Sequence, residues 1–239
     1  MTNSRTLDFG FAARLVAEFG VIVLGVLVAL AVDSWVGQRA QREDERQALE
    51  TLRADLVLSS QDLRDVSAET AVQVARLNWL QNFPVDRSRE FPVDSLFAIN
   101  SAANVTNAYV PILRTYEALV ATGQLGLIRS QPIQMDLASL RKEMEVYLDF
   151  RDQSTTLWLL SYKPMWDRYI GGEFGRGGGT VGPLPAPDVV EVMQSREFRA
   201  LVSSRRVFLN IVTYRGQDLA EAMEALISLI DAETAMRAE

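Results

Sequence analysis

The sequence predicts an all-α protein with a single membrane-spanning helix, and three observations lead to that fold class. An uncharged aliphatic run lies near the N-terminus, at residues 19–32. The longer segments behind it repeat apolar residues at the spacing of helices that bury one face. No segment shows the sustained alternation of apolar and polar residues that is typical of a half-buried strand.

The apolar N-terminal segment is interpreted as a transmembrane anchor at residues 11–36, preceded by a short tail at residues 1–10. Its uncharged core, FGVIVLGVLVALAV, is shorter than the about 20 residues that cross a bilayer as a helix. Extension in both directions supplies the missing length and brings charged residues near the two ends of the span. Long charged side chains can reach the headgroups from such positions.

The anchor also carries residues that suit contact with another membrane helix. Gly20, Gly25 and Ala29 are small, and small residues let helices approach closely in a bilayer. Trp35 lies at the far edge of the span, where an aromatic side chain suits the interface. We therefore expect the partners to be the lipid bilayer and either a membrane protein or a second copy of this chain.

Two other interpretations of this segment stay open. A core helix of a soluble protein is also apolar, although the unbroken aliphatic run favours a membrane. Arg5 and Arg14, with the small residues of Ala29-Leu30-Ala31, resemble a cleaved signal peptide. A helical pattern that continues through Asp33 favours an uncleaved anchor. Because a short basic tail usually stays in the cytoplasm, we expect a bacterial inner-membrane protein with a periplasmic soluble domain.

A charged helical stalk is predicted at residues 37–48, followed by a helical-bundle domain at residues 49–239. From Gln38 the stalk has neither glycine nor proline, and its charges lie on every side of a helix. Mostly apolar residues then recur every seven positions, which predicts a helix with one buried seam. The two series are Leu49, Leu56, Leu63, Thr70, Leu77 and Leu52, Ser59, Val66, Gln73, Leu80.

Two short helices are predicted after this first long one. The first covers residues 95–109. The second begins at Pro111, because proline suits the first helical turn, and ends with Gly123 as a C-terminal cap.

Two further long helices complete the predicted bundle. One begins near Ser130, and Pro164 should kink or end it because proline removes a hydrogen bond and crowds the preceding turn. The other begins near Ser195. The stripe expected to be buried on this last helix is Leu209, Val212, Gly216, Leu219, Met223, Leu226 and Ile230.

An aromatic stripe lies near the end of the second long helix. Trp158, Tyr162 and Trp166 recur every four residues, with Met165 and Tyr169 beside them. Core packing is the plainer interpretation. The alternative is a partner-binding surface, since tryptophan, tyrosine and methionine are enriched at interfaces.

Two other motifs are better explained by structural roles than by catalysis or ligand binding. Residues 171–187 are rich in glycine and proline but lack the Gly-Lys-Ser/Thr ending of a phosphate-binding loop, so we expect a mobile connection. Four carboxylates cluster on the second long helix, but basic residues alternate with them, which favours an ion-paired, solvated face. They are Glu143, Glu145, Asp149 and Asp152.

The chain has no cysteine and no histidine. Thiolate and imidazole metal sites and histidine-based catalysis are therefore excluded. We accordingly predict no catalytic residue, no metal site and no cofactor. A net charge of −7 also argues against a nucleic-acid partner.

Two blocks resemble an uncharacterised family of small bacterial single-span membrane proteins. The first is EFGVIVLGVLVALAVDSWVGQRAQREDERQALETLRADL, and the second is TYEALVATGQLGLIRS, from Thr115 to Ser130. That family usually has asparagines around the tryptophan, where this chain has Asp33, Ser34, Val36 and Gly37. The resemblance implies a one-span helical protein and carries no catalytic residues.

Three functions are compatible with this sequence. The leading hypothesis is a non-catalytic, membrane-anchored interaction protein, such as an accessory subunit that stabilises a respiratory or photosynthetic complex. The second is an extracytoplasmic sensory or ligand-binding bundle. The third is an enzyme that works with carboxylates alone.

Overall fold

The computed structural model is all-helical, as the sequence predicted. It describes residues 9–84, 90–91, 109–165 and 186–236, and within these ranges it contains helices and no strands. The chain divides into two compact units, Met1–Leu49 and Glu50–Glu239. This division falls one residue after the predicted start of the bundle domain.

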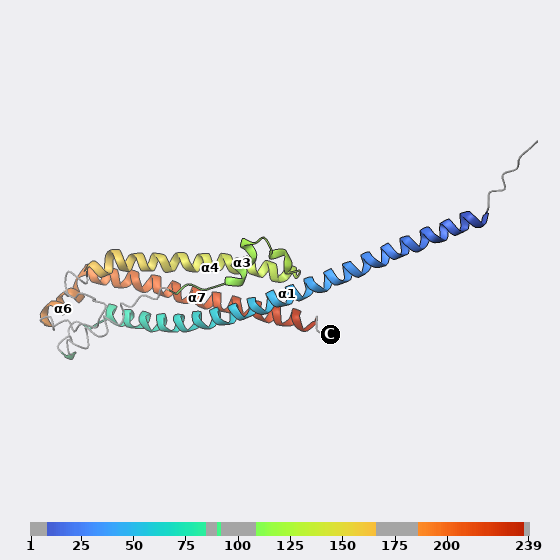
Figure 1. Cartoon of the computed structure of the whole chain (residues 1–239). Helices are drawn as coiled ribbons and strands as arrows, with labels where there is room; N and C mark the ends of the chain where they lie inside the picture. The colour runs from blue at the N-terminus through green and yellow to red at the C-terminus, as the bar shows by residue number, and fades with distance from the viewer. Residues whose placement is uncertain (1–8, 85–89, 92–108, 166–185, 237–239) are drawn as a thin grey trace, which may run out of the picture. The chain divides into compact units, whose positions relative to one another are not determined.

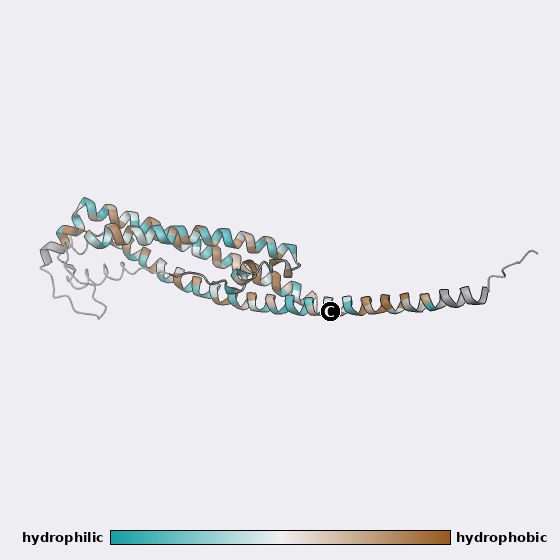
Figure 2. Cartoon of the chain, turned by 45° about the horizontal axis from the view of Figure 1, so that its top comes forward, coloured by the Kyte–Doolittle hydropathy of each residue, from teal (hydrophilic) through white to brown (hydrophobic). Residues whose placement is uncertain are grey.

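Helix α1, Phe9–Gln81, is 73 residues long and runs through both units. Its length follows from the sequence, because neither glycine nor proline occurs between Gln38 and Phe83. The helix ends shortly before Pro84, as expected because a proline disfavours helical geometry in the residue before it. In the first unit, every side chain described from Val23 to Asp44 is exposed. Figure 2 shows the strongly apolar part of this stretch.

Three long helices form the second unit. They are α1 from Glu50 onward, α4 (Gln131–Leu157) and α7 (Arg196–Met236), which lie side by side in Figure 1. Helices α1 and α4 run in the same direction and α7 runs back, so α4 and α7 pack antiparallel. Three shorter elements accompany them: α3 (Arg114–Ala121), the 3₁₀ turn η2 (Leu125–Leu127) and α6 (Ala186–Gln194).

The seven-residue seam predicted on α1 is confirmed within the second unit. Of its positions from Leu52 to Leu80, only Val66 is half-buried, and all the others are buried. The stripe predicted on α7 is also confirmed, since every one of its seven members is buried. That helix starts where expected: the Ser195 hydroxyl accepts a hydrogen bond from the Phe198 amide at 3.1 Å, as an N-terminal cap does.

Helix α4 also begins as predicted, with Pro132 in its first turn. Its end differs in detail from the expectation. Before Pro164 the helix widens into the π-helical turn η3, Trp158–Tyr162, in which the Lys163 amide donates to the Trp158 carbonyl. Proline cannot donate to the carbonyl four residues back and crowds it, so a locally wider turn accommodates it. The helix continues to Met165, where this described range ends.

The region before α3 corrects one prediction. Pro111 does not start the helix, which begins at Arg114. The Asp55 carboxylate of α1 accepts hydrogen bonds from the amide and hydroxyl of Thr115, at 2.8 and 2.7 Å. A side chain from another helix therefore binds the first-turn donors, and local sequence around Pro111 could not reveal it. Gly123 caps the helix as predicted, with a φ of 68°.

The remaining predictions for this unit fall mostly outside the described residues. The short helix expected at residues 95–109 lies there except for Tyr109. The predicted loop at residues 171–187 also lies outside the described residues, except for its last two residues. Ala186 and Pro187 begin helix α6, which the sequence interpretation missed. Proline at a first-turn position is compatible with a helix start.

Candidate functional site

The anchor residues are the first part of the candidate site. The apolar window within Glu18–Gln81 has a mean hydropathy of 2.3 and is 0% buried, so one helix among the described residues is long and apolar enough to cross a membrane. Length and composition alone support that statement, and a signal sequence meets the same criterion. The complete exposure of the window separates it from the buried core helix of a soluble domain.

The small residues of the anchor are open to their surroundings. A Cβ atom added at Gly20 or Gly25 would meet nothing within 4 Å, and Ala29 is exposed. A partner helix would therefore have room at these positions. The structure contains one chain, so their role in association stays a prediction.

Trp35 is also exposed, and the guanidinium carbon of Arg39 lies 5.8 Å from the centre of its ring. The arginine lies one turn further along α1, on the same side of the helix. A cation beside an aromatic ring contributes about 0.5–1 kcal/mol at an exposed site. The pair places a basic group beside an aromatic ring, as expected for the headgroup region that the sequence predicts at this end of the span.

The aromatic stripe is the second part, and its placement supports core packing. Tyr162 is fully buried and Met165 is buried, while Trp158 is half-buried against the same cluster. We name this the Phe198 cluster; its buried members are Leu77, Leu80, Phe83, Tyr162, Met165, Val192, Met193, Phe198, Val202 and Leu209. The prediction that Tyr162 and Met165 form a partner surface is therefore wrong. Both side chains fill the core where α1, η3, α6 and α7 meet, and Trp166 and Tyr169 lie outside the described residues.

The π-helical turn exposes other apolar side chains instead. Leu160 is 74% exposed and Leu159 is half-exposed, immediately after Trp158. A π turn rotates successive side chains differently from an α-helix and occurs frequently at functional sites. Leu160 lies about 200° around the helix from Trp158, so its exposure agrees with the period-four pattern of the buried side.

A fully buried arginine lies beside the stripe and was missed by the sequence interpretation. Arg205 of α7 is 0% exposed, and its guanidinium carbon lies 5.7 Å from the ring centre of Tyr162. Burial lowers the pKa of Arg205 to about 10, so the group stays protonated at neutral pH. Its position offered a signal, since it falls between Val202 and Leu209 on the buried stripe of α7. Arginine is almost never fully buried without compensating contacts.

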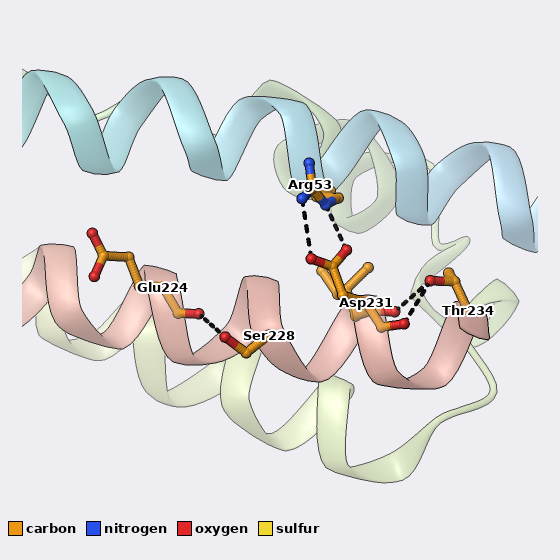
Figure 3. Close-up of polar contacts among 6 residues, drawn as sticks. Arg53, Glu224, Ser228, Asp231 and Thr234 are labelled. Atoms are coloured by element: carbon orange, nitrogen blue, oxygen red, sulfur yellow. Dashed lines mark hydrogen bonds and ion pairs between the residues drawn. The ribbon is translucent and has the colours of Figure 1, made fainter. Parts of the chain in front are cut away.

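Charged side chains also join α1 to α7 at the other end of the bundle (Figure 3). The Arg53 guanidinium donates to both carboxylate oxygens of Asp231, at 2.6 and 3.0 Å. Hydrogen bonding to Arg53 holds the pKa of Asp231 below its usual value. Arg64 forms a second ion pair, with Glu224. Both pairs are largely exposed, so they align the two helices more than they stabilise them.

The segment from Tyr109 to Thr115 is bound to α1 by polar contacts. Ser59 donates to the Ile112 carbonyl at 2.9 Å and accepts from its amide at 3.3 Å. The Tyr109 hydroxyl donates to the Asp62 carboxylate at 3.3 Å, and burial raises the pKa of Tyr109 to about 12. The contacts with Ile112 explain why a polar residue stands at the seam position Ser59 of α1.

The carboxylates of α4 lie on a solvated face, as the sequence analysis favoured. Glu145 pairs with Arg141 at 3.1 Å, Asp152 pairs with Arg151 at 2.6 Å, and Asp149 accepts from Gln153 at 2.8 Å. Among the described residues, no group of three or more acidic side chains could hold a metal ion.

No family model matches this chain, and no curated protein or solved structure matches it either. The resemblance to the single-span family stays a prediction. Function must therefore be inferred from the chain's own physical features.

Proposed function

We propose that this chain is a non-catalytic interaction protein, anchored in a bacterial inner membrane by the apolar part of α1 and acting as an accessory subunit of a larger membrane complex. The observation that carries the proposal is the apolar window of α1, which is 0% buried. Exposing so much aliphatic surface to water is costly, at about 25 cal/mol per Å². A bilayer removes that cost, and a helix satisfies its own backbone hydrogen bonds there.

The bundle supports an interaction role over a catalytic one. Several of its described charged groups are paired on the surface, Arg205 is buried in the core, and the chain has no histidine or cysteine to supply a nucleophile or base. In this proposal the anchor contacts membrane partners through Gly25 and Ala29, which lie about 40° apart around the helix, whereas Gly20 lies about 140° from Gly25. The bundle extends into the periplasm and offers its surface to soluble partners.

Co-purification from native membranes tests the proposal. Gly25→Leu should leave insertion intact, because leucine is favourable in lipid, and should reduce recovery of the partners by filling the close-approach surface. Val23→Leu is the matched control, because Val23 lies about 200° around the helix from Gly25. Equal recovery of every partner by the wild type and both variants would remove the small-residue face from the proposal.

A second variant tests the bundle surface. Trp158→Ala is a poor choice, because Trp158 packs on the Phe198 cluster and its loss would weaken the core. Leu160→Ser changes an exposed side chain in the same turn and leaves the core untouched. If Leu160→Ser and Gly25→Leu both retain all partners, the proposal loses both of its contact surfaces.

A further inference from the structure

The interior of the bundle changes from apolar to polar halfway along its length. On α1, the fully buried positions between Leu63 and Leu77 are Ser67, Thr70 and Gln73. On α4, the only buried side chain between Tyr147 and Tyr162 is that of Ser154. Helix α7 contributes Thr213. We name these five side chains the polar layer: Ser67, Thr70, Gln73, Ser154 and Thr213.

The three helices meet closely where this layer begins. A Cβ atom built at Gly216 of α7 would lie 2.6 Å from the Ser67 hydroxyl oxygen and 3.4 Å from the Tyr147 ring. From that point α1 and α4 proceed together towards the Phe198 cluster while α7 runs back from it. The polar layer therefore occupies one level of the bundle, between Gly216 and the cluster.

The polar layer adds little attraction between the helices. The Thr70 hydroxyl donates to the Val66 carbonyl at 2.7 Å, and the Thr213 hydroxyl donates to the Leu209 carbonyl at 2.9 Å, each within its own helix. The buried Oε1 atom of Gln73 accepts no hydrogen bond in the described part of the chain. A buried acceptor without a donor disfavours the packed state, since opening the structure would let water bind it.

Buried apolar side chains are also fewer at this level, where α7 contributes Val212 beside Thr213. The Phe198 cluster includes Leu77 and Leu209 but not Leu63 or Leu219, which are buried on the other side of the polar layer. Cooperativity between two parts of a fold depends on the packing that joins them, and regions with few apolar contacts open at lower free energy.

We propose that the polar layer divides the bundle into two blocks that open separately, so that the block containing the Phe198 cluster opens while the rest stays folded. Gly216 fixes the level at which the three helices meet, and Gln73 weakens the packing between that level and the Phe198 cluster. This inference rests on the bundle geometry and is independent of the proposed membrane function.

Native-state hydrogen exchange on the full-length protein in detergent micelles tests the inference. Helix ends exchange rapidly in any case, so the deciding comparison is between variants. Gln73→Leu replaces the polar side chain with an apolar one of similar size. It should slow exchange by about tenfold at Leu77–Phe83, Trp158–Tyr162 and Phe198–Val202, because the unpartnered acceptor is removed. Exchange at Leu52–Leu63 and Leu219–Ile230 should be unchanged.

Gln61→Leu is the matched control, because Gln61 is exposed on the same helix. It should change exchange in neither block. Equal slowing of both blocks by Gln73→Leu would show one cooperative bundle and overturn the inference. No slowing in either block would show that Gln73 does not weaken the packing, and would overturn it equally.

Discussion

The two units of this protein use the same helix in opposite ways. In the first unit, α1 is apolar on all sides and exposed from Val23 to Val32. In the second unit, α1 buries one mostly apolar seam and exposes only a few apolar side chains outside it, such as Leu58. A helix that is apolar all round needs an apolar surrounding, whereas one with a single apolar stripe needs partner helices and water. The difference teaches that the surroundings of a helix can be inferred from how its apolar residues are distributed around it.

The largest expected effect separates the two regions. Removing residues 1–36 should move the protein from the membrane fraction to the soluble fraction, because the exposed apolar stretch is deleted and the buried seam is not. The circular dichroism spectrum of the product should remain strongly helical. A truncated protein that still sediments with membranes would show that the bundle itself binds lipid.

The next effect concerns the close approach of α7 to α1 at Gly216 and Ser67. Gly216→Ala should destabilise the bundle by about 1–3 kcal/mol, because its new methyl group would lie 2.6 Å from the Ser67 hydroxyl oxygen. Ser67→Ala removes that oxygen. In the double variant the alanine at 216 should be tolerated or stabilising, since alanine favours a helix over glycine by about 1 kcal/mol. Urea unfolding of the four proteins measures the coupling, and strict additivity would contradict the contact.

A smaller effect is expected from the cap that α1 provides to α3. Asp55→Ala removes the acceptor of the Thr115 amide and hydroxyl and should cost about 1 kcal/mol. Asp65→Ala is the control, because Asp65 is exposed on the same helix. The two variants should differ in their thermal unfolding midpoints. Equal midpoints would mean that the contact with Thr115 adds no stability.

The smallest effect concerns the exposed ion pair of Arg53 and Asp231. The pKa of Asp231 is lower in the folded state, so the pair contributes stability above the unfolded-state pKa, and that contribution is lost as pH falls through the folded-state value. Asp231→Asn should therefore be slightly less stable than wild type at pH 7 and should approach it in acid or at high salt. A difference that persists at high salt would indicate a role other than charge.

Sequence patterns predicted what depends on periodicity. The spacing of apolar residues decides which side of a helix is buried, and it predicted the seam of α1 and the stripe of α7. The start of α7 after Ser195 depends on a local cap. Features that depend on other helices could not be predicted. Asp55 caps a helix that begins at Arg114, far along the chain, and the need for glycine at position 216 comes from Ser67. Arg205 lay on a predictable stripe, but its charge suggested a surface.

In the candidate site, too, one part could be predicted from the sequence and another could not. The apolar helix was predictable because its signal is composition, and its apolar window is exposed. That this helix crosses a membrane stays a prediction. The aromatic stripe was not, because its residues suit a core and an interface equally. Tertiary packing decided that Tyr162 belongs to the core, and the π turn before Pro164 exposes Leu160 instead.

The most direct test of the account asks whether the N-terminal tail and the bundle are reached by a reagent from opposite sides of a membrane. Because the chain has no cysteine, Ser4→Cys and Ser139→Cys each introduce a single thiol, one in the N-terminal tail and one at an exposed position of α4. The account predicts that a membrane-impermeant maleimide added to intact spheroplasts labels Ser139→Cys at once and labels Ser4→Cys only after lysis. Labelling of both variants from the same side would contradict a membrane-crossing α1.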